Sequence, residues 1–282
     1  NDTAIIMQTM SLKWIKHWNG NKSGIRQGYE EALLKALIDS SSLSDRYRVT
    51  TDNSPRRTIA DEANIFNAGF DVLITTAGNP KFKNIAKLII SEPVDFGILG
   101  ARIAVYRKDS AADFLKASKA AYRIATIAQP HDWSDVPIYK ANRFQLLKVS
   151  NLEACFSAVE SGDADYLALG ANEVVSLVKQ YAATASTLKI DSQSVIYYPM
   201  PLQIYCHPDQ KTLALTLRGQ LQSFIENGRL RQLFRSFYGP AIAQVNLQER
   251  QVIFLSNPSL DQAPDLRQYL SPLINQQTTQ QF

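Results

Sequence analysis

The sequence predicts an α/β fold built from two similar halves, and three observations support this prediction. The stretches "IADEANIFNAGFDVLITTAGN" (59–79) and "LEACFSAVESGDADYLALGAN" (152–172) repeat one pattern. Helix-like and strand-like stretches alternate along the chain with short connections, which is typical of parallel sheets covered by helices. The length of 282 residues also exceeds that of most single domains.

The repeated pattern is an amphipathic helix, a glycine, one further residue, an aspartate and a buried strand. In the second copy the helix has the spacing i, i+3, i+4, i+7, at Leu152, Cys155, Phe156 and Val159. The first copy has Ile59, Glu62, Ala63 and Phe66 at the same offsets. Both stop at a glycine, Gly69 or Gly162, a residue that accepts the left-handed conformation closing a helix. Helix–glycine–strand units also occur in any α/β protein, so the weight of the repeat comes from its place in the chain.

The composition is that of an ordinary globular protein, with 45% hydrophobic and 20% charged residues. The net charge is +4, but the 30 basic and 26 acidic residues are interspersed, so no nucleic-acid partner is expected. The basic run "RLRQLFR" (229–235) fits a solvated helix face better than a nucleic-acid patch. The start, "NDTAIIMQTM", lacks a basic region followed by an apolar one, so residue 1 is read as a mature terminus left after removal of a signal peptide.

Catalytic and metal chemistry find little support in the sequence. There is no GxSxG, HExxH, phosphate-binding loop or GxGxxG motif. His17, His131 and His207 lie far apart, and Cys155 and Cys206 read as small core residues without a disulfide. We therefore expect a protein without catalytic residues, metal or cofactor.

The chain reads as βαβαβ twice, followed by a return segment. In the first half we expect a strand at 3–9, a loop holding Trp14, His17 and Trp18, a helix at 28–41, a strand at 47–51, the first copy of the repeat, and a strand at 101–106. In the second half we expect a helix at 110–122, strands at 123–128 and 144–150, a loop at 129–135, a helix starting near Val136, the second copy, a helix at 172–183 and a strand at 194–199. The return segment adds a strand at 202–207 and a helix at 212–227 that breaks at Gly228 and resumes to 239. The tail after Pro258 is expected to lie on the surface or to be partly disordered.

The loops that follow the repeated strands are the expected ligand site. Open α/β sheets bind ligands beyond the carboxyl ends of their strands, and each copy places a loop there. These loops are "TTAGNPK" (75–81) and "ALGANE" (168–173).

At this point the chain resembles the extracytoplasmic solute-binding proteins of family 3, the amino-acid-type receptors of ABC importers, which have the type 2 periplasmic-binding-protein fold. The resemblance rests on the repeated unit, on "GILGARIAVYRKD" (97–109) and on the closing helix pair "FIENGRLRQLFRSFYG" (224–239). "HDWSD" (131–135) and "QERQVIFLSNPSL" (248–260) resemble a bacterial subgroup with transporter-like substrate-binding domains.

The resemblance implies two lobes joined by two crossover strands, with a ligand cleft between the lobes that closes over a small molecule. The crossovers fall near Ile103–Lys108 and Tyr197–Leu202. The lobes are then 1–104, 105–200 and the return segment 201–282. It also implies a periplasmic, monomeric protein that binds a small polar ligand, either amino-acid-like or a small organic acid, and delivers it to an ABC permease.

The two anchors that such receptors use for an α-amino acid are altered here. Counting from Asp71, the positions of the usual threonine and carboxylate-binding arginine hold Pro80 and Lys83. Counting from Asp165, the position of the usual ammonium-binding carboxylate holds Gly170. Lysine keeps the charge of arginine but lacks its planar fork, so the identity of the ligand stays open.

Candidate ligand-binding residues follow from these loops, and each has a structural alternative. The candidates are Trp14, Thr75, Thr76, Asn79, Lys83, Arg102, Gln129, His131, Trp133 and Asn172. Threonine is also a good strand residue, and Lys83 is equally consistent with a solvated lysine. Arg102 fits a salt bridge at the crossover as well as a ligand contact, Asp135 reads as a helix N-cap, and Glu173 fits a first-turn helix residue as well as a ligand contact.

Two other functions remain open on the sequence. One is a dehydratase-type enzyme on the same scaffold, with His131 or Glu173 as its acid or base. The other is an extracytoplasmic sensor domain that signals through a membrane protein when ligand closes it.

Overall fold

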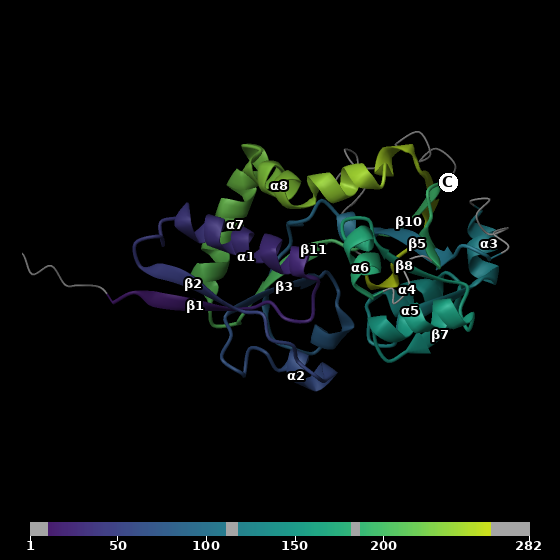
Figure 1. Cartoon of the computed structure of the whole chain (residues 1–282). Helices are drawn as coiled ribbons and strands as arrows, with labels where there is room; N and C mark the ends of the chain where they lie inside the picture. The colour runs from purple at the N-terminus through teal and green to yellow at the C-terminus, as the bar shows by residue number, and fades with distance from the viewer. Residues whose placement is uncertain (1–10, 111–117, 182–186, 261–282) are drawn as a thin grey trace, which may run out of the picture. The chain divides into compact units, whose positions relative to one another are not determined.

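The structure is a computed structural model that describes residues 11–110, 118–181 and 187–260 (Figure 1). The chain forms two compact units by its backbone contacts. The first unit comprises Asn1–Ile74, Ala86–Glu92 and Ile204–Arg231, and the second comprises Thr75–Ile85, Pro93–Gln203 and Gln232–Phe282. The expected lobe boundaries at 104 and 200 stay a prediction.

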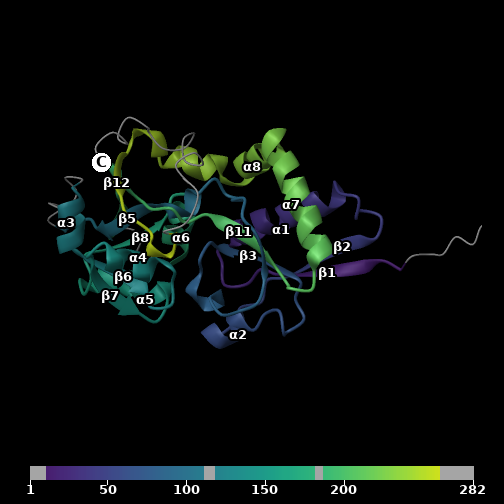
Figure 2. The same ribbon diagram turned by 180° about the vertical axis from the view of Figure 1, so that it is seen from behind.

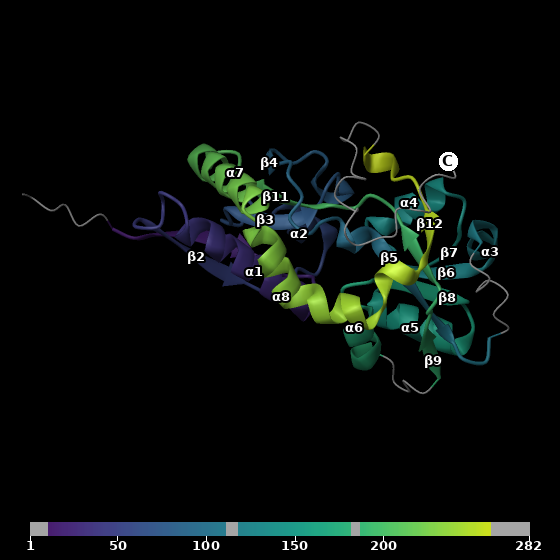
Figure 3. The same cartoon turned by 90° about the horizontal axis from the view of Figure 1, so that it is seen from above.

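The first unit is organised around a sheet with the strand order β2-β1-β3-β11-β4. Its strands are β1 (Lys13–Trp18), β2 (Tyr47–Asp52), β3 (Val72–Thr76), β4 (Leu88–Ile90) and β11 (Leu202–Cys206). Strand β1 is parallel to β2 and β3, whereas β11 and β4 pair with each other in antiparallel orientation. Helices α1 (Gly24–Asp39) and α7 (Lys211–Glu226) pack on each other and on this sheet, as Figure 3 shows from above. Their buried leucines, such as Leu33 and Leu217, form part of the core. Removing this apolar surface from water stabilises the fold.

The second unit contains a sheet with the order β12-β10-β5-β8-β6-β7, and β9 pairs with β5. Its strands are β5 (Ala101–Arg107), β6 (Thr126–Pro130), β7 (Gln145–Val149), β8 (Tyr166–Gly170), β9 (Leu188–Ile190), β10 (Ser194–Tyr197) and β12 (Gln251–Phe254). Its helices are α3 (Lys119–Ile124), α4 (Asp135–Ala141), α5 (Leu152–Ser161) and α6 (Val174–Tyr181). Helix α8 (Arg229–Gln244) begins in the first unit and continues in the second (Figure 2).

The repeated sequence pattern forms the same local structure in each unit. The glycines Gly69 and Gly162 have φ of 93° and 86°, as the pattern predicts. The aspartate two residues later then exchanges two hydrogen bonds with one residue of the neighbouring parallel strand. The Asp71 amide donates to the Lys16 carbonyl (2.8 Å), and the Lys16 amide donates to Asp71 Oδ2 (2.8 Å).

In the second unit, Asp165 and Thr126 make the same two bonds, at 2.9 and 2.7 Å. The repeat thus starts a strand in register beside its parallel neighbour, since the aspartate carboxylate accepts from a backbone amide of that neighbour and the carbonyl of the same neighbouring residue accepts from the aspartate amide. The two copies differ in their helices: α2 (Ile59–Ala63) is shorter than α5 and continues as turns up to the glycine.

One sequence-based expectation is wrong near the start of the chain. Trp14, His17 and Trp18 lie in strand β1 rather than in a loop; the strand expected at 3–9 falls outside the described residues. Near the other end, the closing helix is longer than predicted and is followed by a strand that is not predicted from the sequence. Helix α8 runs on through Pro240 to Gln244, and residues 251–254 form strand β12 beside β10.

The other elements occur close to their predicted places, with shifted ends. Helix α3 covers Ile124, so β6 starts three residues later than expected and takes Gln129 and Pro130 out of the predicted loop. The first part of the helix predicted at 110–122 lies among residues that the structure does not describe. Cys155 and Cys206 are both buried, as expected of core residues.

Candidate functional site

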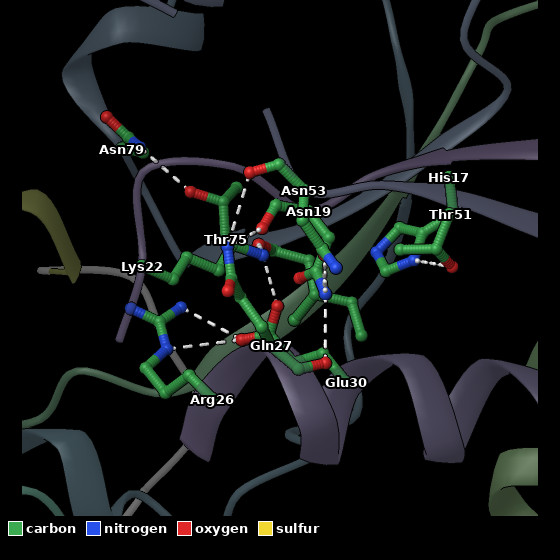
Figure 4. Close-up of polar contacts among 11 residues, drawn as sticks. His17, Asn19, Lys22, Arg26, Gln27, Glu30, Thr51, Asn53, Thr75 and Asn79 are labelled. Atoms are coloured by element: carbon green, nitrogen blue, oxygen red, sulfur yellow. Dashed lines mark hydrogen bonds and ion pairs between the residues drawn. The ribbon is translucent and has the colours of Figure 1, made fainter. Parts of the chain in front are cut away.

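The end of β3 and the turn that follows it, residues 75–79, hold three of the predicted ligand residues together, and this segment is called the ligand loop. Thr75, Thr76 and Asn79 are each at least nine-tenths buried. The Asn79 side chain donates to Thr75 Oγ1 (2.9 Å), a bond drawn in Figure 4, and accepts from the Lys81 amide (3.1 Å). Asn79 therefore caps the short 3₁₀ turn Pro80–Phe82 and fixes the hydroxyl of Thr75.

A second loop of the same unit meets this one. Thr76 Oγ1 lies 3.1 Å from Ser134 Oγ, and Lys81 Nζ lies 3.5 Å from Asp132 Oδ2. The second loop follows β6 and holds the predicted residues His131 and Trp133. His131 is exposed and is held by Val149: its backbone amide donates to the Val149 carbonyl, and its Nδ1 lies 3.2 Å from the same oxygen.

Two buried side-chain oxygens near the ends of the parallel strands β6 and β8 make no hydrogen bond within the described structure. They are Gln129 Oε1 and Asn172 Oδ1, on residues that are 1% and 2% exposed. A buried acceptor without a partner costs free energy unless a ligand or water donates to it. This pair of oxygens is therefore the strongest indication of a binding site in the second unit.

The space beside Gly170 explains how these side chains fit. A Cβ atom at position 170 would lie 2.6 Å from Asn172 Oδ1 and 3.2 Å from Glu173 Oε1. The absence of a side chain at Gly170 therefore makes room for Asn172 and brings the Glu173 carboxylate to the end of β8. Helix α6 begins after Glu173, so Glu173 precedes the helix instead of lying in its first turn.

Arg102 is held inside the second unit by a polar network. Its guanidinium is 2.8 Å from Asp135 Oδ1 and donates to the Tyr198 hydroxyl (3.1 Å), while that hydroxyl also donates to Asp135. Burial by itself lowers the pKa of Arg102 and is the largest single effect, but Asp135 together with Tyr198, Tyr139 and Glu173 outweighs it, so the pKa is raised. Burial, reinforced by Asp135, raises the pKa of Tyr198 well above its usual value.

This network corrects the expected role of Asp135. The N-cap of α4 is Ser134, whose side chain makes no cap hydrogen bond, and Asp135 is the first residue of the helix. Its carboxylate turns to Arg102 because an unpaired guanidinium in the interior would be far more costly than an uncapped surface helix. Arg102 thus makes the structural salt bridge that was one of its two predicted roles.

Two further predicted residues lie at exposed positions. Lys83 is exposed and closes the 3₁₀ turn that Asn79 opens. Trp14 is 59% exposed on β1, where it pairs with Arg48 of β2. It is the second residue of the strand and lies four positions, or roughly 13 Å of strand, before the carboxyl end at Trp18.

The first unit contains a buried charged cluster that the sequence did not reveal (Figure 4). Lys22 donates to Glu30 and to the Ile74 carbonyl (2.8 Å), and Arg26 donates to the other oxygen of Glu30 (2.9 Å). Glu30 has no solvent-exposed surface. Desolvation, which the charge of Glu30 only partly offsets, lowers the pKa of Lys22 to about 8.

Next to this cluster lies a third unpartnered oxygen. Asn19 is fully buried, and its Nδ2 donates both to the Gln27 carbonyl (2.9 Å) and to Asn53 Oδ1 (3.2 Å). Since both donors of the amide are used, the remaining Asn19 Oδ1 is the atom left without a partner. The sequence shows only that these residues come after β1. The spacing of polar and apolar residues does not show that Glu30, which lies on a helix, is buried.

The described residues contain no group of three or more His, Cys, Asp or Glu side chains placed to hold a metal ion. Within the same residues no helix is long and apolar enough to cross a membrane. The side chains described in the two units offer hydrogen bonding: they supply hydroxyls, amides and buried acceptor oxygens that lie close to paired charges.

No protein-family model matches the sequence, and no curated protein matches it either. The fold, in contrast, is shared with many solved structures. The probable amino-acid ABC transporter extracellular-binding protein YtmK of Bacillus subtilis is similar with a TM-score of 0.59 and 13% identity, over 81% of this chain and 99% of that one. The periplasmic VFT2 domain of BvgS from Bordetella pertussis has a TM-score of 0.59 and 16% identity, over 79% and 93% of the two chains.

A third similar structure contains a bound ligand. It is a periplasmic His/Glu/Gln/Arg/opine family-binding protein of Silicibacter pomeroyi in complex with lysine, with a TM-score of 0.56 and 13% identity, over 80% of this chain and 97% of that one. The chain described here therefore has the two-lobed α/β fold of periplasmic binding proteins, as its sequence pattern predicts. At these identities the likeness establishes the fold and leaves the ligand to be found.

Proposed function

We propose that this protein is a non-enzymatic periplasmic solute-binding protein that captures a small polar ligand, amino-acid-like or a small organic acid, for an ABC importer. The observation that carries the proposal is the pair of buried, unpartnered oxygens of Gln129 and Asn172 near the ends of neighbouring parallel strands. The fixed hydroxyls of Thr75 and Thr76 supply further polar groups in the same unit. A small polar molecule with hydrogen-bond donors satisfies such oxygens, and contacts of this kind orient ligands in binding sites of proteins.

A sensor domain is the second candidate function. Its support is the similarity to the periplasmic VFT2 domain of BvgS, which is as high as the similarity to the transporter receptor YtmK. Both candidates use the same ligand site, so they differ in the partner that reads the bound state: a permease or a membrane signalling protein.

Ligand binding is tested by a thermal-shift screen of the purified protein. The panel contains amino acids, short peptides, dicarboxylates, polyamines and cyclic acids. A ligand present at about a hundred times its Kd stabilises the folded state by about 2.7 kcal/mol, which raises the Tm of a protein of this size by several degrees. Monitoring each hit for chemical change by mass spectrometry distinguishes binding from turnover.

Variants then locate the ligand. The shift is expected to disappear in Asn172→Ala, which removes a buried acceptor, and to persist in Lys140→Ala, which changes an exposed residue of α4. Lys83→Ala tests whether the lysine at the position of the usual arginine contributes. A hit that keeps its full shift in Asn172→Ala, or a complete absence of hits, contradicts the proposed site.

A further inference from the structure

We propose that the C-terminal segment 250–260 is a strap that holds the ligand loop 75–79 in place and so governs how often this loop opens. From the sequence, a surface tail is predicted only after Pro258, and the structure fixes the segment 250–260 within the second unit at three successive points. The proposal rests on the proposed function only in taking residues 75–79 as part of the ligand site. The contacts between the strap and these residues exist with or without a ligand.

The base of the strap is fixed by Arg250 and by strand pairing. Arg250 is 5% exposed, and its guanidinium donates to three backbone carbonyls, those of Val245 (2.7 Å), Asp191 (2.8 Å) and Ser194 (2.9 Å). The four residues of β12 then pair with β10 in parallel register from Ser194 to Tyr197. An arginine that satisfies this many carbonyls is difficult to replace, since each would be left without a donor in the interior.

The middle of the strap is clamped by two asparagines. Asn142, at the end of α4, donates from Nδ2 to the Ser256 carbonyl (2.8 Å) and accepts from the Ser256 amide (3.2 Å). Asn257 donates from its own Nδ2 to the Pro199 carbonyl (2.7 Å) and accepts from the Ser259 amide (2.9 Å). Asn142 is 6% exposed and Asn257 is 8% exposed, so water competes weakly for these bonds.

The tip of the strap touches the ligand loop. A Cβ atom at Gly78 would lie 2.9 Å from the Ser259 carbonyl oxygen and 3.6 Å from Leu260 Cδ2, and Gly78 has φ of 67°. Only glycine therefore suits this position, both for its backbone conformation and for the approach of the strap.

The loop and the strap also share one anchor. The Ala77 amide donates to the Pro201 carbonyl (2.9 Å), and Asn257 binds the Pro199 carbonyl two residues earlier. Because neither proline has an amide hydrogen, the 199–201 segment offers acceptors here, and the loop and the strap each supply donors. Loosening the strap removes the bond from Asn257 to the Pro199 carbonyl, which holds the shared 199–201 segment, and it also removes the packing over Gly78.

Hydrogen exchange of the intact protein tests the proposal without any ligand. In Asn257→Ala, the amides of Ala77 and Asn79 are expected to exchange about tenfold faster, as expected for the loss of a buried hydrogen bond. Amides of β6 and β8 in the same unit keep their protection. Asn257→Asp retains the acceptor for the Ser259 amide but sets a carboxylate oxygen against the Pro199 carbonyl, so its loop amides are expected to exchange at least as fast as those of Asn257→Ala.

The matched control is Gln251→Ala, which alters an exposed side chain of β12 and leaves its backbone pairing intact. A second readout uses the reactivity of a thiol placed in the loop by Thr76→Cys. Burial raises the pKa of Cys155 and of Cys206 to about 12, so the native thiols stay silent toward a disulfide reagent near neutral pH. The labelling rate of Thr76→Cys is expected to rise about tenfold when Asn257→Ala is added.

Unchanged exchange and labelling of the loop in Asn257→Ala overturn the strap proposal. A uniform acceleration across β6 and β8 overturns it as well, because it reveals global destabilisation instead of a local link. Since neither measurement involves a ligand, the strap can fail while the binding screen succeeds, and the reverse also holds.

Discussion

The ion pair between Lys22 and the fully buried Glu30 is the residue-scale feature with the clearest energetic consequence. Removing a lysine from water lowers its pKa, and the paired carboxylate recovers only part of that cost. Glu30 also binds Arg26, so the cluster is held by two cations around one carboxylate at the start of α1. The pair joins α1 to β3 through the Ile74 carbonyl, directly before the ligand loop.

The titration of Lys22 gives the first pH prediction. Its pKa is about 8 in the folded protein and 10.5 in the unfolded chain, so between these pH values the unfolded chain binds more protons. The free energy of unfolding contributed by this group therefore rises with pH. Relative to Lys22→Met, the wild type is expected to gain about 2 kcal/mol between pH of about 7.5 and 9.5, measured by urea unfolding.

Using the difference from Lys22→Met removes the contributions of other groups. The buried cysteines and tyrosines have raised pKa values and destabilise the folded state as pH rises, but they do so equally in both proteins. Parallel pH profiles for the two proteins would show that Lys22 does not titrate in this range.

The Arg102–Asp135 pair predicts a large loss of stability with a diagnostic rescue. Asp135→Asn leaves a buried guanidinium without its carboxylate, and we expect a loss of about 3 kcal/mol or more in the free energy of unfolding. The double variant Arg102→Met, Asp135→Leu is expected to recover part of this loss, because it buries no charge. Denaturant unfolding of Arg102→Met, of Asp135→Leu and of the double variant gives the coupling energy, and simple additivity would contradict a paired role.

At the scale of elements, the repeated glycine–x–aspartate turn is a unit that could be recognised in the sequence because all its signals are local. The apolar spacing, the glycine with positive φ and the aspartate lie within a few residues of one another, and the structure confirms them in both copies. Local signals of the same kind identified β2, β8 and α7.

What the sequence could not provide was the partner of each polar side chain across the chain. Asp135 looks like an N-cap from its neighbours alone, whereas its actual partner, Arg102, lies in a different strand. Trp14 made β1 look like a loop because an exposed tryptophan breaks the expected alternation. Before the tail, "QVIFL" (251–255) is an apolar run and so a strand signal. It is not predicted as a strand from the sequence because polar residues flank it.

The turn glycines predict a contrast between two glycine-to-alanine changes. Gly69 has open space around its Cα but φ of 93°, so Gly69→Ala is expected to destabilise the protein by about 1 kcal/mol through backbone strain alone. Gly219 lies exposed in the interior of α7, also with open space, and Gly219→Ala is expected to stabilise by about 0.5 kcal/mol. Thermal or urea unfolding of the two variants measures both effects, and equal signs would contradict the assignment of strain to the turn.

At the scale of the whole molecule, the two compact units are interleaved along the chain. The first unit takes its residues from three stretches and the second unit takes the stretches between and after them. The chain passes back and forth, so neither unit corresponds to one continuous piece of sequence. Removing the chain from Gln232 onward therefore removes β12 and most of α8 from the second unit instead of deleting an independent domain.

The order of strands has a consequence for folding during synthesis on the ribosome. The first sheet needs β11 between β3 and β4, and the second sheet receives its edge strand β12 from residues 251–254. A chain that emerges from the ribosome amino-terminus first can complete the first sheet only after residue 206, and the second only after residue 254. Sheets that depend on such distant pairings form slowly. The two sheets of the nascent chain therefore stay incomplete until β11 and β12 have been made.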